Sequence, residues 1–395
     1  MLYTGKGGVG KTTTSAATAV LAASRGVPTL VASADAAHSL GDVLGERLGA
    51  APRRLAAHLD AVEVDARAET ERHWGSIREY LVALFRYQGI EDVVADELAL
   101  LPGAEELTTL LAVEEHARSG RYELVVVDCA PTDAALRLLT LPEVARGALR
   151  VLLRVQRAVA GVLTPLARGL IPVPLPGSAV FRDAEDLLYR RLRTLRERMT
   201  DRRTSTRLVV TSERMVIDEA LRAYTDLALF ELGCDAVVMN RMLPAAAAEE
   251  PFFRDWARVQ AERRREVEEL FAPLPILEGP LQEDEVVGLV RLERQGRDLF
   301  GDRAPEAVLC DAPRLRFRSL RGGGCQAVLP LPHARAEDLD VAKLDDQLLI
   351  ATGARRRALP LPRRVARLDL AEARLDRGRL LLRFDPPPPA ARAGT

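Results

Sequence analysis

The chain has 395 residues, of which 48% are apolar and 29% charged, and its formal net charge at pH 7 is −1. This composition suits a globular protein of two or three domains, and the balanced charge argues against nucleic acid as a partner. The most apolar stretch, residues 158–181, contains Arg168 and four prolines, which excludes stable membrane insertion as a helix. With no visible secretory signal and four cysteines that lack close pairing, the sequence predicts a reducing, cytoplasmic location.

Two of the three lysines in the chain lie in one glycine-rich loop near the N-terminus. The loop, GKGGVGKTT over residues 5–13, follows a short apolar segment and leads into a predicted helix over residues 12–24. Its spacing matches the P-loop, in which backbone N–H groups surround the phosphates of a nucleotide. We therefore predict Lys11 at the β- and γ-phosphates and Thr12 on Mg²⁺, with a loop made by Gly7, Gly8, Val9, Gly10 and Thr13. The alternative is a glycine-rich turn that matches by chance.

Short apolar runs rich in β-branched residues then alternate with helical patterns up to about residue 300, at 29–32, 124–127, 208–210 and 237–239. Continuous apolar runs are typical of parallel strands that are buried on both faces. One run ends in Asp128, and a carboxylate at the carboxyl end of a buried strand is suited to hold Mg²⁺, here through water. Helical blocks at about 70–120 and 140–200 are longer than crossovers need and predict a separate helical layer.

From about residue 312 the pattern changes to short alternating segments separated by turn signals, which predicts a small β-sandwich. The order of these features resembles the α-crystallin, or small heat-shock, domain. The predicted fold is an α/β P-loop sheet with a helical insertion layer, followed by a C-terminal β-sandwich. We assign residues 1–302 to the ATPase domain, 303–311 to a linker, 312–386 to the sandwich and 387–395 to a disordered, proline-rich tail.

Lys6 and several further segments resemble the ATPase class that includes the arsenical pump ATPase (ArsA) and the tail-anchored-protein targeting factor. The matching segments are SADAAHSLGDVLG at 33–45, DCAPTDAALRLLTLPE at 128–143 and PLQEDEVVG at 280–288. In that class, a lysine one residue after the first loop glycine reaches across a dimer interface to the nucleotide of the partner. The resemblance therefore implies an ATP-hydrolysing homodimer in which Lys6 acts in trans, by the logic of an arginine finger.

The resemblance also implies roles for four other residues. Asp35 lies where the family orients the attacking water, although an aspartate in this position can also be a helix N-cap. Asn240 lies where the family recognises adenine, although an asparagine after a strand can also cap a turn. Pro280 and Leu281 match the segment that forms the wall of the adenine pocket.

Three departures from the family pattern affect the expected function. Glu249 and Phe252 stand where the eukaryotic targeting factor has its Cys-x-x-Cys zinc clamp, so no zinc is expected. The four cysteines do not form the thiolate cluster that binding of As(III) requires. Residues 133–135, Asp-Ala-Ala, replace the Gly-His-Thr of the family, which leaves the turnover rate open.

Our first hypothesis is a cytoplasmic, homodimeric ATPase whose closure on ATP reshapes the helical layer to handle an apolar protein or membrane-protein client. Residues 150–171 are apolar around nearly the whole helix, and they form either an internal packing helix or part of a client groove. The second hypothesis is the ATPase subunit of an arsenite or anion pump. The third is a scaffold that uses nucleotide as a slow switch.

Overall fold

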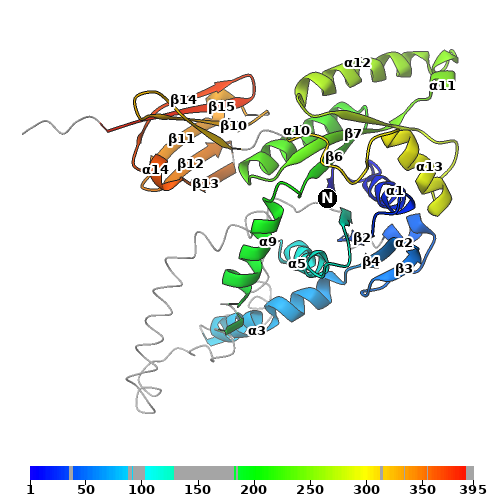
Figure 1. The fold of residues 1–395 in the computed structure, drawn as a ribbon, viewed down its shortest axis with the longest axis horizontal. Helices are drawn as coiled ribbons and strands as arrows, with labels where there is room; N and C mark the ends of the chain where they lie inside the picture. The colour runs from blue at the N-terminus through cyan, green and yellow to red at the C-terminus, as the bar shows by residue number, and fades with distance from the viewer. Residues whose placement is uncertain are drawn as a thin grey trace, which may run out of the picture. The chain divides into compact units, whose positions relative to one another are not determined.

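The computed structural model describes residues 1–34, 39–87, 91, 103–128, 182–183, 186–311, 315–332, 334–353 and 355–387 (Figure 1). These residues belong to two compact units. One comprises Met1–Thr14, Arg202–Glu285 and Gln295–Thr395, and the other comprises Ser15–Asp201 and Val286–Arg294. Asp35, all but the first residue of the segment 128–143, and the apolar helix predicted at 150–171 lie outside the described residues.

The unit that contains the N-terminus holds four parallel strands of the eight-stranded sheet, in the order β1 (Leu2–Thr4), β6 (Thr206–Val210), β7 (Cys234–Met242) and β8 (Ile276–Pro280). Every residue of β6 is buried, as its continuous apolar run predicts. Because β6 and β8 pair in parallel with their neighbours, the carboxyl ends of all four strands meet at one edge. The predicted strands at 208–210 and 237–239 are confirmed.

The helices of this unit are α10 (Arg214–Leu229), α11 (Ala245–Glu249) and α12 (Arg254–Leu270), and two helices cross between the units, α1 (Lys11–Ser24) and α13 (Leu289–Phe300). Helix α1 is rich in alanine, and its alanines are buried, which allows close packing. It ends near Gly26, whose φ of +90° is the left-handed conformation of a helix C-terminus. The helix predicted over 12–24 is thus confirmed.

The other unit holds the remaining four strands, in the order β3 (Arg53–Ala56), β4 (Leu59–Glu63), β2 (Thr29–Ser33) and β5 (Leu124–Asp128). Its helices are α2 (Ser39–Leu44), α3 (Ala66–Tyr87), α5 (Ala104–Arg118) and α9 (Leu192–Met199), with a π-helical turn η2 (Asp186–Arg191) before α9. Helix α5 contacts both α3 and α9. The described parts of the two predicted helical blocks are therefore helical, and the α/β fold class is confirmed.

The C-terminal residues form two antiparallel sheets (Figure 1). One has the order β14 (Asp369–Asp376), β15 (Arg379–Asp385), β10 (Cys325–Pro330), β9 (Arg316–Ser319), and the other the order β11 (Leu339–Leu344), β12 (Gln347–Thr352), β13 (Arg355–Pro360). A short 3-10 turn, η3 (Ala336–Asp338), precedes β11, and a single helical turn, α14 (Arg363–Ala366), follows β13. Alternate residues of β15 are buried, namely Leu380, Leu382 and Phe384, as a sandwich requires. The predicted β-sandwich is confirmed.

A buried ion pair holds the segment after α13 against the sheet of its unit. Arg207, on β6, is fully buried beside Asp235 on β7, with both pairs of facing N and O atoms 3.4 Å apart. Its guanidinium also donates to the Tyr3 hydroxyl at 3.1 Å and to the carbonyl oxygens of Pro305 and Ala307 at 3.0 and 2.8 Å. Since a buried charge is stable only when it is paired and hydrogen-bonded, these contacts satisfy the guanidinium and fasten the segment to the sheet.

Candidate functional site

The loop between β1 and α1 contains glycines that have no room for a side chain. Gly5, Gly8 and Gly10 have φ values of +153°, +80° and +92°. A Cβ on Gly5 would lie 2.3 Å from the carbonyl oxygen of Val209, and a Cβ on Gly10 would lie 2.4 Å from Nδ2 of Asn240. At Gly7 and Gly8, by contrast, nothing lies within 4 Å of the Cβ position. The loop backbone is therefore packed against β6 and β7 on one side and open on another, as a phosphate cradle requires.

The two lysines of the loop are joined through the backbone. Lys11 is the first residue of α1, and its Nζ donates a hydrogen bond to the carbonyl oxygen of Lys6 at 3.1 Å. One turn further, both the N–H and the hydroxyl of Thr14 donate to the carbonyl oxygen of Gly10, at 3.0 and 2.8 Å. The ammonium of Lys11 thus lies over the loop, where α1 directs the N–H groups of its first turn. A helix start with an added ammonium binds anions.

Asn240 holds the loop in place from β7. It is buried, and its Nδ2 donates to the carbonyl oxygen of Val9 at 2.9 Å. Its Oδ1 lies 2.7 Å from where a Cβ on Gly279 would be, so Gly279 must be glycine for the amide to fit. Sequence reasoning missed this contact; the available signal was a polar amide directly after the apolar run 236–239. The predicted contact of Asn240 with adenine remains a prediction.

Pro280 and Leu281 come directly after Gly279 in the chain. Pro280 ends β8, and the N–H of Leu281 donates to the carbonyl oxygen of Met242, on β7, at 2.7 Å. The side chain of Leu281 is 45% exposed. The two residues therefore lie at the same sheet edge as the loop, with an apolar surface available to a flat ring, and their role at adenine remains a prediction.

Asp128 and the start of the predicted switch segment lie together in the other unit. Ser33 pairs with Asp128 across β2 and β5, and the N–H of Ala34 donates to the carbonyl oxygen of Asp128 at 3.0 Å. Asp128 is buried at the carboxyl end of β5. Asp35, the residue after Ala34 in the chain, lies outside the described residues, and its role stays a prediction.

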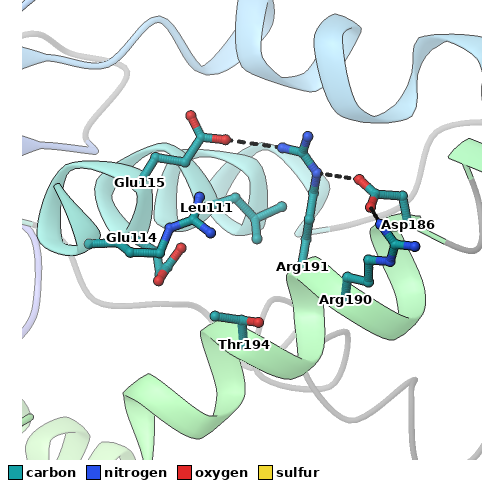
Figure 2. Close-up of a pocket in the computed structure, with 8 residues that line it drawn as sticks. Leu111, Glu114, Glu115, Asp186, Arg190, Arg191 and Thr194 are labelled. Atoms are coloured by element: carbon teal, nitrogen blue, oxygen red, sulfur yellow. Dashed lines mark hydrogen bonds and ion pairs between the residues drawn. The ribbon is translucent and has the colours of Figure 1, made fainter.

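A separate cavity of about 260 Å³ lies among the helices of that unit (Figure 2). It is lined mainly by charged side chains of α5, η2 and α9, namely Glu114, Glu115, Arg118, Asp186, Arg190 and Arg191. Figure 2 shows Arg191 between two carboxylates, 3.0 Å from Glu115 and 2.7 Å from Asp186. The lining is mainly charged, and Arg191 links Glu115 on α5 to Asp186 on η2. The cavity therefore does not offer an apolar groove.

His73, on α3, extends the same network. Its Nδ1 lies 3.3 Å from Nη1 of Arg191, and its Nε2 lies 3.3 Å from Oε2 of Glu69. Burial, with the charge of Arg191 second, lowers the pKa of His73 below its usual value, against the opposing effect of Glu69. Since a guanidinium only donates, Nδ1 is the acceptor and the ring is neutral near pH 7. The network is therefore a structural link among three helices.

Comparison with protein families supports the interpretation of this geometry. The family model described as "Anion-transporting ATPase" matches residues 1–301. A second model, described as "HSP20-like domain found in ArsA", matches residues 322–384. The first match covers the glycine-rich loop, Asn240 and Pro280–Leu281, and the second covers most of the C-terminal sandwich.

Curated relatives are similar over nearly the whole chain. A putative arsenical pump-driving ATPase of Aquifex aeolicus is 32% identical over 97% of this chain and 98% of its own length. A similarly named protein of Chlorobaculum tepidum is 35% identical over 94% of this chain and 92% of its own. The ATPase GET3 of Podospora anserina is 29% identical over 73% of this chain and 87% of its own. Within the ranges that the structure describes, no helix combines the length and the apolar character needed to cross a bilayer.

Proposed function

The chain belongs to the anion-transporting ATPase family and carries the HSP20-like domain found in ArsA, and we propose that it binds and hydrolyses ATP as a homodimer. Closure of the dimer on ATP would reshape the helical layer for an apolar protein client. The observation that carries the proposal is the loop of residues 5–10, with its open face at Gly7 and Gly8 and the ammonium of Lys11 above it.

The residues of the glycine-rich loop fit the phosphates of a nucleotide. The loop is open where phosphate oxygens would lie. Its glycines adopt the positive φ values that this shape needs, and the hydrogen bond from Asn240 holds the loop in place. Thr12 in the first turn of α1 and the buried carboxylate of Asp128 would hold Mg²⁺, the latter through water. The ion would supply charge neutralisation at the phosphate oxygens.

Three side chains would then act on the phosphates and the water. Lys11 would bind the β- and γ-phosphates as a compact cation. Lys6 would reach the nucleotide of the partner protomer and stabilise the charge of the transition state once the dimer has closed. Asp35 would orient the attacking water through its carboxylate.

The Gly10→Ala variant is expected to raise the dissociation constant for ATP at least about tenfold. An alanine at φ of +92° is strained by about 1–3 kcal/mol, and its Cβ would also displace the amide of Asn240. The measurement is equilibrium binding of a fluorescent ATP analogue. Gly49→Ala is the matched control, because nothing lies within 4 Å of its Cβ position and its φ is not positive. Equal affinities for both variants would contradict the proposed loop function.

The HSP20-like domain supports a role with protein clients, and we place the protein in the cytoplasm without nucleic-acid partners or zinc. We keep the domain boundaries as proposed, with the ATPase at 1–302, a linker at 303–311, the sandwich at 312–386 and a tail at 387–395.

A second candidate function is that of an arsenical pump ATPase, because several relatives carry that name. As(III) binds thiolates, and the described cysteines are poorly suited to supply them. Cys234 and Cys325 are buried, and burial raises the pKa of the Cys234 thiol well above its usual value. Cys310 is partly exposed, and burial raises the pKa of its thiol as well. The described thiols therefore favour the client-handling function.

Two measurements test the proposed function against its alternatives. We expect magnesium-dependent ATP hydrolysis whose rate does not change when As(III) or Sb(III) is added. Stimulation by either metalloid would favour the pump. A single-turnover experiment in which bound ATP stays intact for hours would instead favour the nucleotide-switched scaffold.

A further inference from the structure

The first helix after Asp35 in the chain is too short to be stable alone. Helix α2 has six residues, Ser39–Leu44, with Gly41 in its first turn. A helix of this length forms in water only where tertiary contacts hold it. Leu40 and Leu44 are buried one turn apart and fix one face of α2. They leave the N–H groups of its first turn without a partner inside the helix, as at every helix start.

A carboxylate from a distant strand supplies one such partner. Oε1 of Glu63, the last residue of β4, accepts a hydrogen bond from the N–H of Gly41 at 2.8 Å. A Cβ on Gly41 would lie 3.4 Å from this oxygen and 2.8 Å from the carbonyl oxygen of Glu46. Glycine at this position therefore lets the carboxylate and the turn after α2 both approach the helix closely. A negative charge beside the first turn also stabilises the helix dipole.

The same end of β4 holds a residue on the other side of Asp35. Glu63 is opposite Ser33 in the parallel register of β4 and β2, and the N–H of Val64 donates to the carbonyl oxygen of Ser33 at 3.1 Å. Two adjacent residues of β4 and its extension thus hold Ser33 and Gly41, and Asp35 comes between these two in the sequence. Fixing both ends of a short segment limits the conformations open to its middle.

We propose that Glu63 is a positioning residue for ATP hydrolysis, which fixes the start of α2 so that the segment before it can act on the attacking water. This inference rests on the proposed function, in which Asp35 orients that water. Glu63 acts through the backbone of α2 and not on the substrate. It should therefore affect turnover and leave nucleotide binding unchanged, because binding depends on the glycine-rich loop that Asn240 holds in place.

Glu63→Ala is expected to lower kcat by about tenfold to a hundredfold, since a misplacement of about 1 Å at a reacting group is enough for such a loss. The dissociation constant for a fluorescent ATP analogue should stay within about twofold of the wild-type value. Asp65→Ala is the matched control, because Oδ1 of Asp65 accepts from the N–H of Ala68 at 2.9 Å in the first turn of α3. It also removes a carboxylate from a helix start, two residues along the chain, and should leave kcat within about twofold.

Two conservative variants separate the reach of the side chain from its charge. Glu63→Gln keeps an acceptor oxygen at the same reach, and its kcat should stay within about threefold of the wild-type value. Glu63→Asp keeps the charge but is one methylene shorter, and it should lose about as much activity as Glu63→Ala. The opposite order, with Glu63→Asp active and Glu63→Gln inactive, would overturn the positioning role and indicate that the carboxylate itself takes part in proton transfer.

Amide hydrogen exchange gives a readout that does not depend on activity. A peptide that covers α2 should exchange faster in Glu63→Ala and Glu63→Asp than in the wild type and Glu63→Gln. Equal exchange in all four proteins would overturn the inference and leave the proposed function intact, as would a wild-type kcat in Glu63→Ala or an equal loss in Asp65→Ala. A wild-type chain that hydrolyses no ATP would overturn both.

Discussion

Lys6→Ala is expected to lower the rate of ATP hydrolysis by about a thousandfold or more while the protomer still binds ATP. A cation supplied in trans is worth about that much in phosphoryl transfer, because it stabilises charge that develops only in the transition state. Binding should persist because the loop glycines, Lys11 and Asn240 do not depend on the side chain of Lys6. Steady-state turnover measures the loss of hydrolysis, and a nucleotide titration of the same variant measures binding.

Lys343→Ala is the matched control, since Lys343 is the one lysine outside the loop and lies on β11 of the sandwich. Lys6→Arg keeps the charge but replaces a compact ammonium with a planar fork, and we expect it to restore little activity. A turnover of Lys6→Ala within twofold of the wild type, in a dimeric sample, would rule out the role of Lys6.

A mixing experiment separates action in trans from action within one protomer. Lys6→Ala keeps its own loop but cannot serve its partner, whereas Lys11→Ala loses its own loop but can still supply Lys6. In an equal mixture half of the dimers are mixed and each has one complete site, so about a quarter of the wild-type rate should return. A mixture as inactive as its two components would contradict the proposal.

Arg207→Leu is expected to lower the free energy of unfolding by about 3–5 kcal/mol, because it leaves the buried carboxylate of Asp235 without its cation. The change also removes hydrogen bonds to the Tyr3 hydroxyl and to the carbonyl oxygens of Pro305 and Ala307. Chemical denaturation followed by circular dichroism measures the loss. We also expect faster proteolysis within residues 301–311, since their attachment to β6 is lost.

Two further variants test whether the loss of stability comes from the unpaired buried carboxylate of Asp235. Arg207→Leu/Asp235→Leu removes both charges and should recover part of the loss, because an apolar pair leaves no uncompensated charge. Arg264→Ala breaks partly exposed ion pairs with Glu268 and Glu278, and it should cost less than about 1 kcal/mol. Equal losses for Arg207→Leu and Arg264→Ala would show that the buried pair has no special role.

The elements with the strongest local patterns could be predicted without the structure. Continuous apolar runs identified β2, β5, β6 and β7, since parallel strands that are buried on both faces contain few polar residues. Two strands of the sandwich were not predicted. These strands are β11 and β14; none of their residues is buried, and pairing with β12 and β15 holds them as strands.

For this protein, the sequence by itself determined the glycine-rich loop with its following helix, the apolar strands β2, β5, β6 and β7, and the family to which it is similar. These features depend on residue types at fixed spacing along the chain, because a turn that needs glycine or the start of a helix is a local property of the sequence. Only the tertiary structure decided that Asn240 bonds to Val9, 231 residues away, and that Arg207 binds the carbonyl oxygens after α13. Such contacts depend on how distant strands align, and residue type alone does not specify which backbone atom a buried polar group will meet.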